Sequence, residues 1–240
     1  VLAYNMYANN VERVFNVAAG MEIFHNFTLL HDDVMDKADV RRGSPTVHKK
    51  WNENTAILSG DGMLVLAYQY LAQCNPSYLK QILDLANDTF IGITDGQQFD
   101  MDFETRNDVS ELEYLEMIRL KTSILLAACL KMGAILGGAS EEDANLLYSF
   151  GEKLGLAFQL QDDLLDVYGD VKVFGKRIGG DIVCNKKTYM YINTCLLASD
   201  EERAILAKWA QYEGDDVDAK IEAVKGVYDS VGIKGKAEAK

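Results

Sequence analysis

Proline is almost absent from this chain of 240 residues, in which only Pro45 and Pro76 occur. Because proline removes a helical hydrogen bond and clashes with the preceding turn, its scarcity favours long helices. No run shows the two-residue alternation of a half-buried strand. Apolar residues instead recur at three- and four-residue steps, as at Leu146, Leu147, Phe150, Leu154 and Phe158. The pattern predicts an all-α fold.

Two serines mark expected helix starts. Ser110 and Ser140 are each followed by acidic residues, which suit an N-cap and the positive end of the helix dipole. Breaks between helices are expected at Arg41–Thr46, Asn75–Ser77, Asn107–Ser110, Gly137–Ser140 and Gly169–Asp181. No linker-like stretch interrupts the helical pattern, and the sequence shows no repeat of fixed period. We therefore predict one domain over residues 1–240.

The charge and cysteine content exclude several classes of protein. With 37 acidic and 24 basic residues, the net charge of −13 argues against nucleic acid and anionic membranes as partners. No apolar stretch is long enough to predict stable membrane insertion. The cysteines show neither metal-site nor disulfide spacing, which predicts free thiols and a cytoplasmic location: Cys74, Cys129, Cys184 and Cys195.

An acidic pentapeptide occurs twice, as Asp32-Asp33-Val34-Met35-Asp36 and as Asp162-Asp163-Leu164-Leu165-Asp166. Residues four apart share a helix face, where like charges destabilise the helix unless a cation offsets them. Carboxylate oxygens together with substrate phosphates are typical Mg²⁺ ligands. One such motif is more often a solvated acidic turn, but two copies in apolar surroundings favour two walls of a metal site.

Basic residues accompany both acidic motifs. Arg41 and Arg42 follow the first, either as phosphate ligands or as two solvated side chains. Lys121 interrupts an apolar helix, where it either extends to solvent or pairs with an anion. A glycine-rich loop with Lys176 follows the second motif and could close over phosphate. It lacks the Walker A arrangement, which argues against a P-loop nucleotide site.

In combination, these motifs resemble those of the trans-isoprenyl diphosphate synthases of the short-chain farnesyl or geranylgeranyl type, the enzymes of head-to-tail prenyl chain elongation. The similarity extends over nearly the whole chain. It rests on Leu29–Asp36, Arg41–Thr46, Gly96–Asp100, Lys121-Thr122, Phe158–Asp166, Gly180-Asp181 and Lys186–Thr188. The resemblance implies a single-domain isoprenoid-synthase helical bundle around a central active-site cavity.

The resemblance also implies that the protein is a Mg²⁺-dependent prenyltransferase and a homodimer. The enzyme would condense isopentenyl diphosphate head-to-tail with an allylic diphosphate by ionisation, condensation and elimination, and the product would be a C15–C20 diphosphate. Two alternatives stay open. A terpene cyclase shares the fold but usually carries an Asn/Ser/Glu second metal motif, and a non-catalytic partner subunit usually loses the aspartates.

The acidic motifs would, by resemblance, hold three Mg²⁺ ions. Asp32 and Asp36 would bind two of the ions, and Asp162 would bind the third. The other carboxylates would support the metal site through bound water or as neighbours of the ligands: Asp33, Asp163 and Asp166.

The resemblance distributes the remaining roles between the two substrates. The allylic diphosphate would be bound by Arg41, Lys121 and Lys176. Isopentenyl diphosphate would be bound with the help of His25 and Arg42. The expected catalytic residues, which line the place where the allylic cation forms, are Gln97, Asp100, Lys121, Thr122 and Gln159.

Product length is expected to depend on the helix before the first motif. At about 1.5 Å of rise per residue, Thr28 lies about 6 Å and Phe24 about 12 Å from Asp32. In the family, a bulky residue five positions before the first aspartate accompanies short products, and Phe27 occupies that position. The alternative is that Phe24 and Phe27 are ordinary core aromatics.

Two segments usual in the family are missing from the printed sequence. A Gly-Lys-Arg-x-Arg-Pro segment precedes the region where this chain begins, and a terminal helix follows the region of Lys234–Lys240. We expect both to be ends left out of the sequence, because the other motifs are intact.

Overall fold

The computed structural model describes residues 1–170, 178–212 and 214–240. By its internal contacts the chain divides into two compact units, which are described separately. The first unit comprises residues 1–89 and 127–149, and the second comprises residues 90–126 and 150–240.

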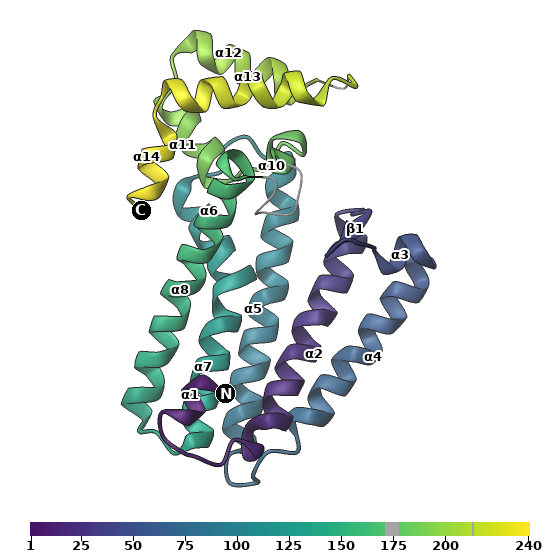
Figure 1. Ribbon diagram of the computed structural model, residues 1–240, viewed down its shortest axis with the longest axis vertical. Coiled ribbons are helices and arrows are strands. Elements are labelled where there is room, and N and C mark those ends of the chain that lie inside the picture. Colours follow the sequence, from purple (N-terminus) through teal and green to yellow (C-terminus); the bar gives the residue numbers. More distant parts are fainter. Residues whose placement is uncertain (171–177, 213) are drawn as a thin grey trace. The chain divides into compact units, whose positions relative to one another are not determined.

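The first unit is built from helices and one short hairpin (Figure 1). Its complete elements are α1 (Leu2–Asn5), α2 (Glu12–Met35), β1 (Val40–Arg41), β2 (Ser44–Pro45), α3 (Val47–Lys50) and α4 (Glu53–Leu71). It also contains the first part of α5 (Leu79–Thr105), most of α7 (Ile124–Gly137) and the start of α8 (Glu141–Tyr168).

Helices α2 and α4 pack side by side along their lengths (Figure 1). Glycines allow this close approach. A Cβ on Gly20 of α2 would lie 3.0 Å from the Ala67 carbonyl oxygen and 3.1 Å from Leu71 Cγ. The absence of a side chain at this position therefore lets the helix backbones come together, at some cost in helix propensity.

The hairpin directly after α2 turns the chain back on itself. Arg41 pairs with Ser44, so the loop consists only of Arg42 and Gly43. Both have positive φ, 52° and 76°, as the type I′ turn of a two-residue hairpin requires. The Thr46 hydroxyl closes the structure by donating to the Ala38 carbonyl oxygen at 2.6 Å.

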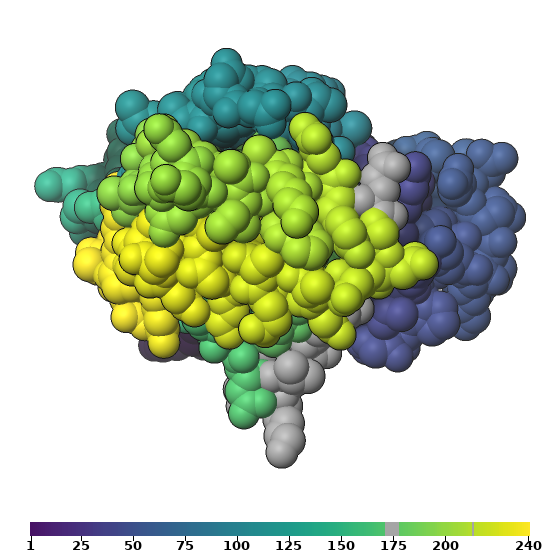
Figure 2. Space-filling model, turned by 90° about the horizontal axis from the view of Figure 1, so that it is seen from above, coloured from purple at the N-terminus to yellow at the C-terminus, as the bar shows by residue number. Residues whose placement is uncertain are grey.

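The second unit contains the remaining helices. They are the later part of α5, α6 (Glu111–Ile118), the π-helix η1 (Arg119–Ser123), the start of α7, the later part of α8, α10 (Gly180–Val183), α11 (Tyr189–Leu197), α12 (Asp200–Ala210), α13 (Val217–Ser230) and α14 (Ile233–Glu238). Helices α12 and α13 lie against each other in the ribbon and in the space-filling view (Figure 2).

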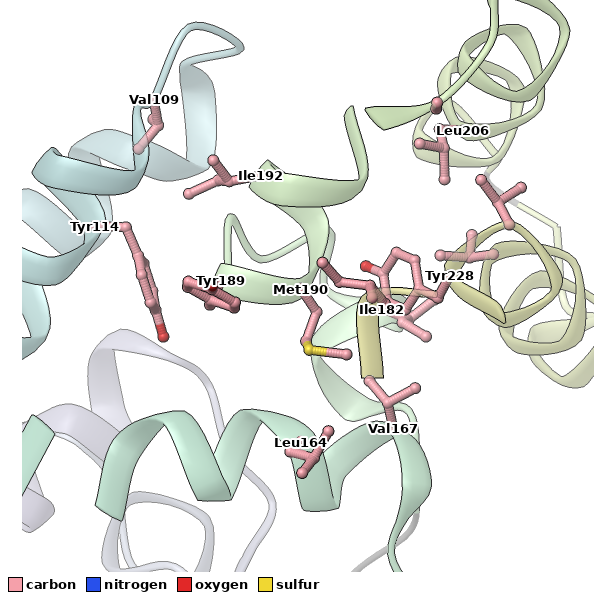
Figure 3. Close-up of a cluster of buried hydrophobic side chains, with 14 of the residues drawn as sticks. Val109, Tyr114, Leu164, Val167, Ile182, Tyr189, Met190, Ile192, Leu206 and Tyr228 are labelled. Atoms are coloured by element: carbon pink, nitrogen blue, oxygen red, sulfur yellow. The ribbon is translucent and has the colours of Figure 1, made fainter. Parts of the chain in front are cut away.

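The core of the second unit joins α6, α8 and α11. Tyr114, Leu164, Tyr189 and Met190 are each at most 7% exposed, and Figure 3 shows them converging from these three helices. Burying a large apolar side chain stabilises a fold by about 1.5–3 kcal/mol. This core therefore holds the second acidic motif, which lies on α8, against distant parts of the chain.

The expected all-α class is confirmed. Four of the expected breaks lie at or between helix ends: Arg41–Thr46, Asn75–Ser77, Asn107–Ser110 and Gly137–Ser140. The fifth, Gly169–Asp181, includes residues 171–177, which lie outside the described residues, and its last two residues begin α10. Ser110 forms a capping box with Glu113, and the Ser140 hydroxyl accepts from the Asp143 amide at 3.1 Å. That residues 1–240 form one domain stays a prediction.

One helical run, Glu111–Gly137, is long and apolar enough by composition to cross a membrane. However, 44% of its most apolar window is buried inside the protein. The run also contains Arg119, which pairs with Glu116 and Glu152, and Lys121, which pairs with Asp100. Partial burial together with ion pairs on both basic residues is typical of a helix in a globular protein rather than of a lipid-facing span.

Candidate functional site

The first acidic motif lies at the C-terminal end of α2, with Asp36 as the C-cap. The hairpin brings Arg41 back onto it. Arg41 Nε donates to Asp33 Oδ1 at 2.7 Å, and Arg41 Nη2 lies 3.5 Å from Asp32 Oδ2. Asp33 is only 4% exposed, so the guanidinium compensates a buried carboxylate next to a half-buried one. Arg42 lies in the exposed turn.

Two of the three residues expected to affect product length, Phe24 and Phe27, form an aromatic row with His31 on α2. Phe24 is buried, and its ring lies 5.5 Å from that of Phe27. Phe27 is half-buried and meets His31 edge-on, with ring centroids 4.7 Å apart. The Thr28 hydroxyl donates to the carbonyl oxygen of His25, so it is bonded within the helix.

The second acidic motif is anchored through Asp163, which is 2% exposed on α8. The Tyr114 hydroxyl of α6 donates to its Oδ2, which also lies 3.4 Å from the Tyr189 amide nitrogen. Gln159 Nε2 donates to its Oδ1 at 3.2 Å. Burial raises the pKa of the Asp163 carboxyl to about 6, because the hydrogen bonds only partly offset the loss of solvation.

Asp166 binds the segment that follows the second motif. Its Oδ2 accepts from the Asp181 amide at 3.0 Å, and its carbonyl oxygen accepts from the Gly179 amide at 2.6 Å. Burial and the neighbouring Asp166 carboxylate raise the pKa of the Asp181 side chain. Asp166 is buried and Asp181 is half-buried, and the nearby Lys186 partly offsets the charge of Asp181.

The raised pKa of Asp163 predicts a pH-dependent stability. Because the carboxyl is protonated up to about pH 6 when folded but only to about pH 4 when unfolded, its contribution is most favourable at low pH. The contribution of Asp163 to the free energy of unfolding should fall by about 2–3 kcal/mol as pH rises through this window. Denaturant unfolding of metal-free protein would show the fall, and Asp163→Asn should lack it; an identical pH profile in both would contradict the assignment.

The predicted Lys-Thr pair lies in the π-helix η1 (Arg119–Ser123). Single π-helical turns within α-helices often occur at functional sites. Two glycines allow this turn to be packed tightly. A Cβ on Gly96 of α5 would lie 2.8 Å from Lys121 Cα, and a Cβ on Gly155 of α8 would lie 2.5 Å from Ser123 Cα. Both approaches are too close for any side chain, so the turn is held between two glycines.

The π-helix presents its polar side chains to the neighbouring helices. Lys121 Nζ lies 2.6 Å from Asp100 Oδ2 of α5. The Thr122 hydroxyl donates to Gln159 Oε1 at 3.2 Å. Since Gln159 also donates to Asp163, a continuous hydrogen-bonded chain joins the π-helix to the second acidic motif.

The carboxylates of the two motifs differ in exposure. Asp32 and Asp162 are half-buried and Asp36 is exposed. Asp33, Asp163 and Asp166 are buried and bonded to protein groups, as described above. Among the described residues, no group of three or more His, Cys, Asp or Glu side chains is arranged to hold a metal ion by itself.

The structure brings together several of the predicted residues within each unit. In the first unit it joins Arg41 to Asp32 and Asp33. In the second unit it joins the predicted residues Asp100, Lys121, Thr122, Gln159 and Asp163. Gln97 is half-buried on α5, one residue after Gly96, and Lys176 lies outside the described residues.

Sequence reasoning missed Tyr114 and Tyr189, which bind Asp163. Neither belongs to a recognisable motif, and Tyr114 lies 49 residues from Asp163 along the chain. The only signal was the capping box at Ser110, which places Tyr114 in the first turn of α6 without showing which way it points.

Comparisons with known proteins show which family this chain belongs to. A family model described as polyprenyl synthetase matches residues 1–227. A geranylgeranyl diphosphate synthase of Methanosarcina mazei is 45% identical over 195 residues, which cover 80% of this chain and 60% of that protein. A geranylfarnesyl diphosphate synthase of Natronomonas pharaonis is 38% identical, covering 91% of this chain and 63% of that protein.

A solved structure supports the same relationship. The crystal structure of a geranylgeranyl pyrophosphate synthase is 44% identical, with a TM-score of 0.93. It is matched over 99% of this chain and 73% of its own. Of the first curated relatives that it matches, however, the chain spans less than two thirds of the length.

Proposed function

This chain belongs to the polyprenyl synthetase family, and on that premise we propose that it acts as a Mg²⁺-dependent prenyltransferase. It would condense isopentenyl diphosphate head-to-tail with an allylic diphosphate. The observation that carries the proposal is the pair of DDxxD motifs, each with partly exposed carboxylates beside buried, bonded ones. Neither a terpene cyclase nor a non-catalytic subunit is favoured by a second DDxxD or by the relatives' names.

The donor set fits Mg²⁺. Hard carboxylate oxygens completed by water and phosphate oxygens are what this ion selects. The three residues expected as direct ligands, Asp32, Asp36 and Asp162, are those that keep exposed surface. When bound, Mg²⁺ would supply positive charge that neutralises a diphosphate leaving group. That three ions bind is part of the proposal.

The buried carboxylates would position their exposed neighbours. Arg41 bonds Asp33 and also reaches Asp32, so it would orient the first motif and present its remaining N–H groups to phosphate. Tyr114 and Gln159 hold Asp163 from two sides and so fix the turn of α8 that carries Asp162. We assign Lys176 to the allylic diphosphate, and His25 and Arg42 to isopentenyl diphosphate, by family resemblance alone.

The π-helix would serve the cationic stage of the reaction. Lys121, oriented by Asp100, would bind the diphosphate as it leaves. Gln159 has both ends of its amide engaged, by Thr122 and by Asp163, and is therefore a fixed dipole. Preorganised dipoles stabilise developing charge without reorganisation. Gln97 and Asp100 on α5 would add further negative potential.

A direct assay tests the proposed reaction. The purified protein is incubated with labelled isopentenyl diphosphate, Mg²⁺ and each allylic primer in turn, and the chain length of the products is measured. A C15 or C20 diphosphate is expected, and chelation of Mg²⁺ should abolish it. The relatives named geranylgeranyl diphosphate synthase support the C20 end of this range. Absence of prenyl product with every primer would refute the proposal.

Phe27 is proposed to limit product length. Phe27→Ala should lengthen the product by at least one isoprene unit, since it removes the half-buried ring that lies between Phe24 and His31. Chain-length analysis of the variant against wild type gives the result. Phe15→Ala, which removes an exposed ring of the same helix, should leave the product unchanged. An unaltered product in Phe27→Ala would assign Phe27 to packing only.

The proposal also covers the oligomeric state of the protein and its location in the cell. A homodimer is expected from the family resemblance. A cytoplasmic location is supported by the four cysteines, none of which forms a disulfide within the described residues.

A further inference from the structure

His31 is held in place from outside its own helix. A carbonyl oxygen can only accept, so the ring nitrogen Nε2 donates to the Ile57 carbonyl oxygen of α4, at 3.1 Å. The ring also meets Phe27 edge-on, with 4.7 Å between centroids and 66° between planes. His31 therefore connects the backbone of α4 to the side chain expected to limit product length.

Gly60 makes room for this ring. A Cβ at position 60 would overlap His31 Nε2 and would lie 2.5 Å from Cδ2 and 3.1 Å from Cε1. Any side chain at this position must displace the imidazole, because the ring already occupies the space. The displaced ring would lose its bond to the Ile57 carbonyl oxygen and its edge contact with Phe27. Gly62, two residues further on the same helix, has no neighbour within 4 Å of its Cβ position.

We propose that Gly60 and His31 determine product specificity by fixing the position of the Phe27 ring. The arrangement depends on Gly60, because the missing Cβ leaves the space that the imidazole occupies. His31 is a positioning residue that acts through Phe27 and needs no contact with substrate. This inference rests on the proposed prenyltransferase function and extends it to residues on a second helix.

The test is the substitution Gly60→Ala, with Gly62→Ala as its matched control. Gly60→Ala should raise the ratio of longer to shorter products by roughly two- to tenfold, the range that corresponds to one aromatic contact. Gly62→Ala should leave the ratio unchanged. The effect must pass through Phe27, so Gly60→Ala should add nothing in a Phe27→Ala background. An unchanged ratio in Gly60→Ala, or an equal further change in the Phe27→Ala background, would overturn the inference.

A second measurement separates this inference from the proposed function. The aromatic NMR signals of Phe27 and the imidazole signals of His31 should shift in substrate-free Gly60→Ala and stay unchanged in Gly62→Ala. If wild type forms no prenyl product, the proposed function fails. The positioning of Phe27 by His31 is then judged by these signals, and unshifted signals in Gly60→Ala overturn it.

Discussion

Asp32→Ala should abolish prenyl transfer while the protein stays folded. Asp32 is half-buried at the end of α2, and its ion pair with Arg41 is long, at 3.5 Å, so its loss should alter the free energy of unfolding by no more than about 1 kcal/mol. However, Asp32 is a proposed ligand of Mg²⁺, and the positive charge of the bound ion would stabilise the leaving diphosphate by several kcal/mol. Turnover should therefore fall at least about a thousandfold.

Steady-state turnover at saturating Mg²⁺ and both substrates, together with thermal unfolding, measures the two effects separately. Asp88→Ala, which removes an exposed carboxylate from α5, is the matched control and should retain wild-type turnover. A metal role for Asp32 would be excluded if Asp32→Ala kept a tenth or more of the wild-type turnover.

Gly96→Ala should destabilise the fold strongly. Its Cβ would lie 2.8 Å from Lys121 Cα and 2.9 Å from the Leu120 carbonyl carbon, both of which are backbone atoms. Backbone cannot rotate away as a side chain can, so either α5 or the π-helix must shift. Overpacking of this kind costs about 3 kcal/mol or somewhat more. The melting temperature should fall by at least about 6 °C for a chain of this size.

Chemical and thermal unfolding of Gly96→Ala provide the measurement, and Gly226→Ala is the comparison. Gly226 lies inside α13, with nothing within 4 Å of its Cβ position, so alanine there should stabilise by about 0.5–1 kcal/mol. Opposite signs for the two glycines are expected. Equal stability of the two variants would mean that the approach of α5 to the π-helix is not as close as described.

Much of the helical framework could be predicted from the sequence because its signals are local. Ser110 and Ser140 begin helices as expected, since the N-cap interaction involves only residues three apart. The break at Arg41–Thr46 was also predicted, but its form was not. The positive φ of Arg42, which makes the turn type I′, is uncommon for a non-glycine residue and carries no sequence signal.

The candidate site was predicted in its chemistry but only partly in its contacts. The carboxylates, Lys121 and Gln159 were expected from their motifs. That Lys121 and Thr122 lie in a π-helix was not, because the turn depends on Gly96 and Gly155 from two other helices. Tyr114 was missed for the same reason, since its hydroxyl meets Asp163 only once α6 packs on α8.

The helical class and the supply of carboxylate and basic groups can be read from the sequence, because helix periodicity, capping and charge are properties of neighbouring residues. The sequence does not reveal which members of each acidic motif are buried and which stay exposed. In the folded chain, Asp33 and Asp163 are buried against Arg41 and Tyr114, while Asp36 and Asp162 keep exposed surface. Burial depends on the residues that pack from distant elements, and these are specified by the fold as a whole.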